Sequence, residues 1–208
     1  MLPFKVVYHE KYDLNLGPHV FPSQKFRLIA ETLLAEKIAA GEDFVKPEPA
    51  SDEDILRVHT PEWTRKLKTG TLTASEVMLL EIPYSQAVVE AFWLAAGGSI
   101  LAGRHTLTDG FAVNIGGGFH HAFPGHGEGF CMINDVAIAI RRLQADRAIA
   151  KCMVVDTDVH QGNGTAAIFA ADPAVLRCPS IRKITTRCPN SARTWTSTWK
   201  TARKMRNI

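Results

Sequence analysis

The chain has 208 residues, 46% of them hydrophobic, which is enough to bury one sizeable core in a single domain. Its formal charge of +3 is unevenly spread: residues 177–208 hold nine Lys or Arg and no Asp or Glu, which leaves 15 basic against 21 acidic residues over residues 1–176. This composition excludes a wholly disordered chain. We expect no secretory signal, because residues 1–7 lack a charged region followed by a long apolar stretch. We also expect no membrane partner, because the longest apolar run, residues 91–103, is too short to span a bilayer.

The first half of the chain predicts one strand followed by several helices. Residues 4–8 are β-branched and aromatic, as in a strand, and residues 24–40 carry apolar side chains at helical spacing. Ser51, with Asp54 three residues on, resembles a capping box that opens a short helix extending to residue 58. Residues 85–108 predict a long helix, and glycines at 97, 98 and 103 would let a neighbouring element pack closely against it.

Strands and helices alternate in the second half. Residues 111–115 and 151–156 predict two buried strands, and residues 132–147 predict a helix between them. This alternation is typical of an α/β fold with a parallel sheet. Ligands of such sheets bind at the carboxyl ends of strands, and the two most polar motifs of the chain follow these two strands directly.

The motif after the second of these strands reads VVDTDVHQGNG. Asp158 and His160 are two residues apart, so both side chains project to one side of an extended segment and can reach one metal ion. Asp156 shares that side. An aspartate that caps a turn, beside a histidine bonded to backbone, is the alternative interpretation of this motif.

The motif after the first strand reads GGGFHHAFPGHGEGFC. The adjacent His120 and His121 point in different directions, and either could act as a general base, since imidazole titrates near neutrality. We expect His126 to face solvent. Cys131 could be a nucleophile, but a small buried side chain is the favoured interpretation. The four cysteines show no paired spacing, so we expect free thiols and a cytoplasmic protein.

Together the two motifs resemble the zinc-dependent histone deacetylase family, in particular its bacterial and class IV branch with the acetoin-utilisation and acetylpolyamine deacetylases. The resemblance also includes His19, Phe21, Pro22 and the segment SDEDILRVHTPEW from Ser51. It implies an arginase/deacetylase-type α/β fold, a parallel sheet flanked by helices that is incomplete at its C-terminus. Residues 1–176 would then be the N-terminal part of a deacetylase domain.

The resemblance also implies a role for each matching residue. Asp158 and His160 match two of three Zn²⁺ ligands, His121 matches the general base and His120 its neighbour. Asp156 and Asn163 match the partners of the two histidines, while Gly129 and Phe130 match a wall of the acyl-lysine tunnel. The implied substrates are acetylated lysine in proteins or acetylated polyamines.

Two residues of the family have no match in this sequence. No Asp or Glu follows Asp172 to supply the third zinc ligand, and the three tyrosines, Tyr8, Tyr12 and Tyr84, all lie in the first half, far from the position of the catalytic tyrosine. We therefore expect the chain as given to be inactive.

The segment over residues 177–208 has no regular periodicity, and a frameshift near codon 177 would explain it, because codons for these residues can be chosen that encode an acidic, family-like segment when they are read one base earlier. We interpret this segment as an aberrant, disordered basic tail. The rival hypotheses are a non-catalytic binding protein and a nucleic-acid-binding arm that uses Trp195 and Trp199.

Overall fold

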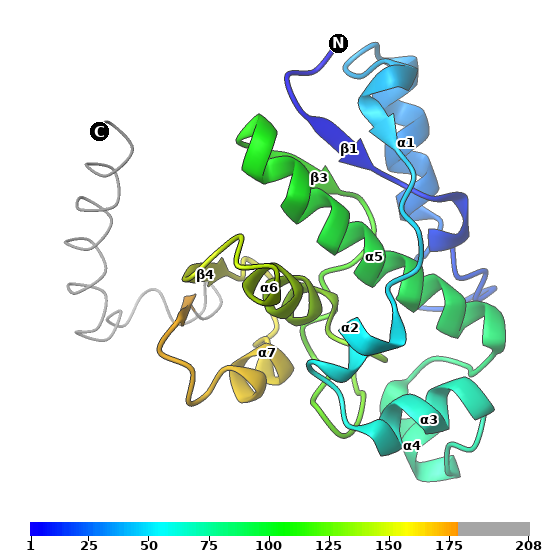
Figure 1. Ribbon diagram of the computed structural model, residues 1–208. Coiled ribbons are helices and arrows are strands. Elements are labelled where there is room, and N and C mark those ends of the chain that lie inside the picture. Colours follow the sequence, from blue (N-terminus) through cyan, green and yellow to red (C-terminus); the bar gives the residue numbers. More distant parts are fainter. Residues whose placement is uncertain (179–208) are drawn as a thin grey trace.

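Three short parallel strands lie at the centre of the N-terminal part of the protein. In the computed structural model, which describes residues 1–178, β1 (Lys5–Val7) pairs with β2 (Phe44–Val45) on one side and with β3 (Ala112–Asn114) on the other. The predicted strands over residues 4–8 and 111–115 are confirmed, and so is the parallel α/β class. Figure 1 shows this sheet with helices packed around it.

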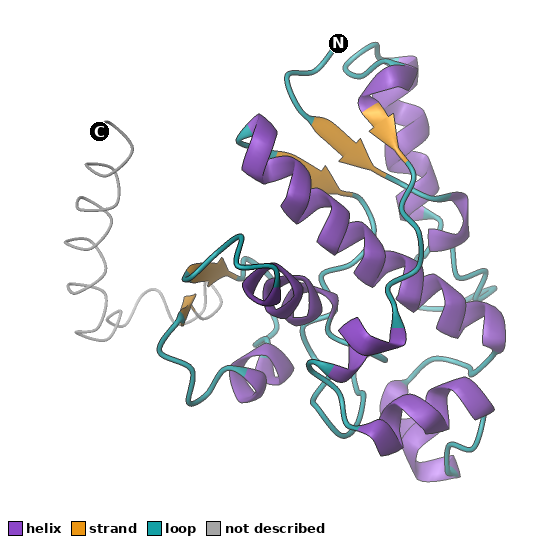
Figure 2. Cartoon of the chain, viewed as in Figure 1, coloured by secondary structure: helices purple, strands orange, loops and turns teal. Residues whose placement is uncertain are grey.

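The long helix α5 (Gln86–Asp109) runs alongside the sheet, as Figures 1 and 2 show, and contributes a large share of the buried core residues. It begins where the sequence predicts, because the Ser85 side chain accepts a hydrogen bond from the backbone N–H of Val88. A Cβ atom at Gly98 would collide with the Tyr12 hydroxyl, so the glycine lets the helix lie directly against its neighbours. The helix is long and apolar enough to cross a membrane, but 61% of its most apolar window is buried, as in a core helix.

The remaining helices are short and cover the ends and sides of the sheet. Those before α5 are α1 (Lys25–Ala35), α2 (Asp52–Leu56), α3 (Pro61–Thr69) and α4 (Ala74–Leu80), with the 3₁₀ turns η1 (Glu10–Tyr12) and η2 (Gly41–Asp43). Those after it are α6 (Asp135–Ala145) and α7 (Asn163–Ile168). The predicted cap at Ser51 is confirmed, since its hydroxyl accepts the N–H of Asp54 at 3.2 Å, although α2 ends at Leu56, two residues earlier than predicted.

The first predicted helix is wrong at its C-terminal end. The observed helix α1 covers Lys25–Ala35, whereas the prediction was residues 24–40. Lys37, two residues after the end of α1, has a positive φ of 57° that no right-handed helix accommodates. Ile29, Leu34 and Ile38, all counted in its apolar pattern, are exposed. The helix instead buries Phe26 and Ala30.

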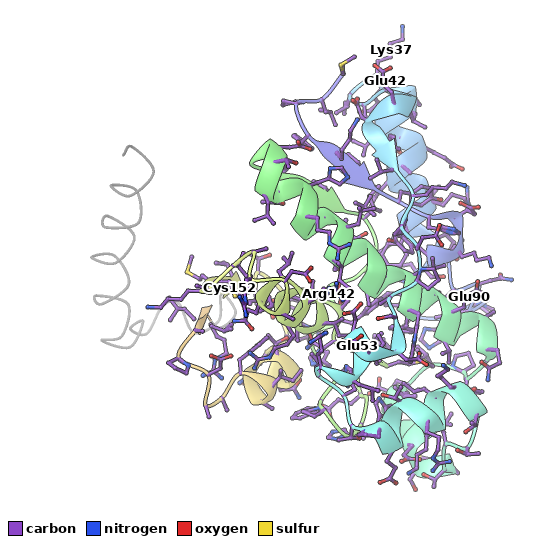
Figure 3. The ribbon with its side chains drawn as sticks, viewed as in Figure 1. Lys37, Glu42, Glu53, Glu90, Arg142 and Cys152 are labelled. Atoms are coloured by element: carbon purple, nitrogen blue, oxygen red, sulfur yellow. The ribbon has the colours of Figure 1, made fainter. Side chains whose placement is uncertain are left out.

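The helix α6 contacts α5, α2 and α7. It packs on α5, where a Cβ at Gly103 would lie 2.7 Å from a methyl group of Leu143. Its Arg142, labelled in Figure 3, contacts the buried carboxylate of Asp54 on α2 at 3.2 Å. The helix lies within the predicted range of 132–147 and begins at Asp135 because the Asn134 side chain caps it.

A second, separate sheet follows α6. β4 (Cys152–Val155) pairs in parallel with β5 (Val175–Cys178), and within residues 1–178 neither strand pairs with the three-stranded sheet. The strand predicted over residues 151–156 is confirmed, but its burial is not, because Met153 and Val155 are 49% and 54% exposed. The apolar residues predicted a strand buried on both faces, whereas Cys152 and Val154 are half-buried and the alternate residues Met153 and Val155 are exposed.

The predicted basic tail over residues 177–208 lies almost entirely outside the described residues. Its first two residues belong to β5, where Arg177 pairs with Val154 and Cys178 with Val155. Regular structure therefore continues two residues beyond the predicted boundary at 176.

Candidate active site

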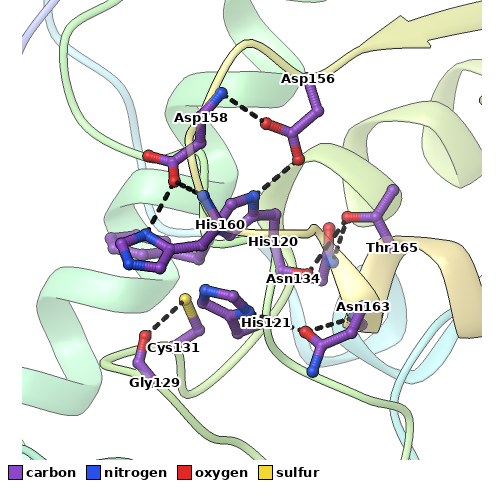
Figure 4. Close-up of polar contacts among 12 residues, drawn as sticks. His120, His121, Gly129, Cys131, Asn134, Asp156, Asp158, His160, Asn163 and Thr165 are labelled. Carbon is purple, nitrogen blue, oxygen red and sulfur yellow. Dashed lines mark hydrogen bonds and ion pairs between the residues drawn. The ribbon is translucent and has the colours of Figure 1, made fainter. Parts of the chain in front are cut away.

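Two loops meet at one end of the strands β3 and β4, and both polar motifs of the sequence lie on them. Residues 116–131 follow β3, and residues 156–162 connect β4 to α7. The backbone N–H of Thr165 on α7 donates to the carbonyl of His120 at 3.0 Å, which ties the second loop to the first. Figure 4 shows the side chains that converge there.

His120 pairs with Asp156, as the sequence predicts. Its Nδ1 lies 2.7 Å from Oδ2 of Asp156, and both side chains are largely buried. The other carboxylate oxygen of Asp156 accepts the backbone N–H of Asp158 at 3.0 Å. One carboxylate therefore orients the imidazole of His120 and shapes the loop that carries Asp158. Gly162 makes room for this pair, since a Cβ there would lie 3.2 Å from Nδ1 of His120 and closer still to the carboxylate.

His121 turns the other way and pairs with Asn163. Its Nδ1 lies 2.7 Å from Oδ1 of Asn163, which also accepts the backbone N–H of Gly164 at 3.0 Å. The amide nitrogen of Asn163 donates to Oε1 of Glu128 at 2.5 Å. The two adjacent histidines thus have different partners, a carboxylate and an amide, although their ring centroids are only 4.1 Å apart.

Asp158 and His160, the predicted metal ligands, contact each other in the loop after β4. Oδ1 of Asp158 lies 2.9 Å from Nδ1 of His160 and accepts the backbone N–H of the same residue at 2.7 Å. That backbone hydrogen bond is the main reason why the pKa of Asp158 is lowered, so its side chain is a carboxylate at neutral pH. Both side chains are half or more exposed.

This pair fits two ligands of a zinc ion. Carboxylate oxygen and imidazole nitrogen are suitable donors, and their separation allows one ion to contact both. A catalytic zinc has three protein ligands, however, and within residues 1–178 no group of three His, Cys, Asp or Glu side chains is placed to hold a metal ion. The described residues therefore offer two side chains of the kinds that bind zinc, and not a complete ligand set.

Buried residues that the sequence analysis did not identify hold the histidine loop in place. The carboxylate of Asp135, at the start of α6, accepts the backbone N–H groups of Gly118 and Phe119 at 3.1 and 2.8 Å and the Ser99 hydroxyl at 2.5 Å. Burial raises the pKa of Asp135, and these three donors oppose that effect. Asp135 follows the family-like motif by only four residues, but nothing in its local pattern indicates a partner 17 residues away.

His59 fixes the opposite side of the same loop. Its Nδ1 donates to the carbonyl of Phe123 at 3.0 Å, and its Nε2 accepts the backbone N–H of Asn134 at 3.0 Å. The Asn134 side chain in turn donates to the hydroxyl of Thr165 at 2.9 Å. Three segments that are far apart in the sequence thus meet at this loop, and Figure 4 shows the contact between Asn134 and Thr165.

Phe130 makes ring contacts with two upstream residues, Phe21 and His19. Phe130 lies 5.7 Å from the Phe21 ring and 5.5 Å from the His19 ring, measured between centroids. Gly129 and Phe130 both have positive φ values, and a Cβ at Gly129 would lie 2.9 Å from the imidazole of His121. The structure therefore brings the predicted tunnel residues next to His121, and the upstream residues His19 and Phe21 join them.

Cys131 and His126 occupy two different surroundings. Cys131 is 4% exposed, and burial raises the pKa of its thiol to about 12, which agrees with the favoured interpretation of a small packed side chain. His126 is partly exposed, as predicted, but its ring stacks on Phe123 at 4.6 Å and its Nε2 lies 3.5 Å from Oε2 of Glu128.

The chain is similar to known deacetylases in sequence and in structure. Residues 19–198 match the profile of the histone deacetylase domain. An uncharacterised protein of Picosynechococcus is 41% identical over 83% of this chain and 58% of its own length, and histone deacetylase 2 of Arabidopsis thaliana is 31% identical over 76% of this chain and 44% of its own length. The crystal structure of the HDA15 HD domain superposes with a TM-score of 0.70 at 26% identity, covering 83% of this chain and 52% of that one. The chain thus spans about half the length of these relatives.

Proposed function

The chain belongs to the histone deacetylase domain family, and from this premise we propose that it carries the histidine pair and two zinc ligands of a deacetylase that removes acetyl groups from acetylated lysine or acetylated polyamines. The observation that carries the proposal is the convergence of His120–Asp156, His121–Asn163 and Asp158–His160 at one end of the strands. A bound Zn²⁺ would polarise the acetyl carbonyl and acidify water.

His121 is the proposed proton acceptor. Because its Nδ1 donates to Asn163, its Nε2 keeps a lone pair that can take a proton from water and later deliver it to the departing amine. His120, whose Nδ1 contacts Asp156, is proposed to donate a hydrogen bond beside the reacting carbonyl. Phe130 and Phe21 would flank the acyl-lysine side chain and keep bulk water away from it.

We further propose that the 208-residue chain by itself turns over slowly or not at all, because the described residues supply two metal ligands and catalytic zinc has three. We also propose a cytoplasmic location, which the unpaired cysteines suggest.

A non-catalytic binding protein would bind a partner without zinc or turnover, so measurements of metal content and turnover distinguish the two functions.

The test is release of acetate from an acetyl-lysine peptide and from an acetylated polyamine, with and without a metal chelator. The assay compares the 208-residue chain with the product of a reading frame corrected near codon 177. We expect chelator-sensitive turnover from the corrected product and a decrease of about 10²-fold or more in kcat for its His121→Ala variant. Turnover that survives both chelation and His121→Ala would overturn the proposal.

A further inference from the structure

Glu128 contacts Asn163, the partner of His121, and the function proposed above gives it no role. Its backbone is fixed: its carbonyl accepts the N–H of Cys131 at 2.9 Å, and the next residue, Gly129, donates its N–H to Leu79 at 3.2 Å. The side chain is 25% exposed. Its two carboxylate oxygens face different partners, Oε1 the amide of Asn163 and Oε2 the ring of His126.

The contact with Asn163 decides which way that amide points. An asparagine side chain presents an acceptor oxygen on one side and a donor NH₂ on the other, and a carboxylate only accepts. The NH₂ group must therefore face Glu128, and the oxygen must face Nδ1 of His121. An oxygen at that position requires a hydrogen on Nδ1 and leaves Nε2 of His121 unprotonated.

We propose that Glu128 is a positioning residue that sets the tautomer of His121 through the amide of Asn163. The backbone N–H of Gly164 also donates to the Asn163 oxygen, so the amide has two contacts that favour the same orientation. Glu128 supplies the one that binds the NH₂ side, over a separation of 35 residues. The value of this tautomer for proton transfer rests on the proposed function, but the tautomer itself does not.

The same contact explains why residue 163 is an amide. An aspartate there would place two carboxylates 2.5 Å apart, and like charges at that distance cannot both stay ionised. Glu128 and Asn163 are therefore a matched pair, and each restricts what the other position can hold.

The experiment is ¹⁵N NMR of the histidine rings in the metal-free 208-residue chain at a pH where the imidazoles are neutral, in wild type, Glu128→Gln and Glu128→Met. The nitrogen shifts of His121, assigned by their loss in His121→Gln, report which ring nitrogen carries the hydrogen. His59 is an internal control, because its tautomer is set by the carbonyl of Phe123 and the backbone N–H of Asn134, and the Glu128 side chain bonds to neither group.

We expect the Nδ1–H tautomer of His121 in wild type and in Glu128→Gln, whose carbonyl oxygen still accepts from Asn163. In Glu128→Met the Nε2–H form should rise at least several-fold while His59 stays unchanged. A His121 tautomer that is the same in all three proteins would overturn the proposal, since Gly164 alone would then orient the amide.

A double-mutant cycle keeps the proposal testable if Glu128→Met does not fold. Asn163→Asp should lower the melting temperature when residue 128 is Glu and lower it clearly less in the Glu128→Gln background. An equal decrease in both backgrounds would overturn the pairing. Neither readout involves acetate release or metal, so failure of the deacetylase proposal leaves both results interpretable.

Discussion

Acidification should lower the free energy of unfolding through His59, which is buried and neutral and bonds to the loop that carries the paired histidines. Both of its ring nitrogens are in use, and burial is the main reason why its pKa is lowered from 6.5 to about 4. Between these two values the unfolded chain binds a proton that the folded protein does not. The free energy of unfolding therefore falls as the pH falls from 6.5 to about 4, and this contribution is fully present above pH 6.5.

The size of the effect follows from the two pKa values. A difference of 2.5 units corresponds to about 3 kcal/mol over the whole window, and about 2 kcal/mol of this is already lost at pH 5. A single domain has a total stability of about 5–15 kcal/mol, so the loss is readily measured.

The assay is urea unfolding at several pH values between 4 and 7, in wild type and in His59→Gln. The glutamine amide can donate to the carbonyl of Phe123 and accept from the backbone N–H of Asn134, but it does not titrate. The free energy of unfolding of the variant should therefore depend less on pH. At pH 7 we expect it to be lower than that of wild type. The difference between the two proteins removes the contribution of the carboxylates. Equal pH slopes in wild type and variant would refute the assignment of this loss to His59.

Two further predictions concern the packing that supports the site. Asp135→Ala should lower the free energy of unfolding by about 3–5 kcal/mol, because it leaves buried donors without an acceptor; a decrease below about 1 kcal/mol in urea unfolding would contradict this. Gly98→Ala should lower stability by about 1–3 kcal/mol, although alanine favours helix, because its Cβ would collide with the Tyr12 hydroxyl. Gly103→Ala, which meets only the end of a flexible side chain, is the matched control, and an equal or smaller loss for Gly98→Ala would argue against the close approach.

Much of the local structure could be predicted from short signals in the sequence. Ser51 and Ser85 cap helices where their pattern indicates. The resemblance to the family, and not the local pattern, grouped His120 and His121 with Asp156 and Asn163, and these side chains are in contact. The same kinds of signal were present but not used for α3 and α4, which begin at the capping residues Thr60 and Thr73.

Features that depend on distant partners could not be predicted in this way. The exposure of Val155 depends on what covers β4, and its β-branched sequence carries no information about that cover. Glu128 and Asp135 bond to residues 35 and 16 or more positions away, so no local periodicity identifies them. Ile38 followed the apolar pattern of α1, but Lys37 adopts a positive φ that ends the helical geometry before it.

The account depends most on Asp158 and His160 acting as two donors to one ion, and titration of the metal-free chain with Zn²⁺ tests this directly. We predict that one equivalent of Zn²⁺ binds. Its binding free energy should be smaller than the about 10 kcal/mol at the low end for complete structural zinc sites, because two protein ligands hold the ion less tightly than a full set. Asp158→Ala and His160→Ala should each abolish it, whereas His126→Ala should leave it unchanged. Zinc binding as tight as that of a complete structural site, or binding that survives both Asp158→Ala and His160→Ala, would contradict the account.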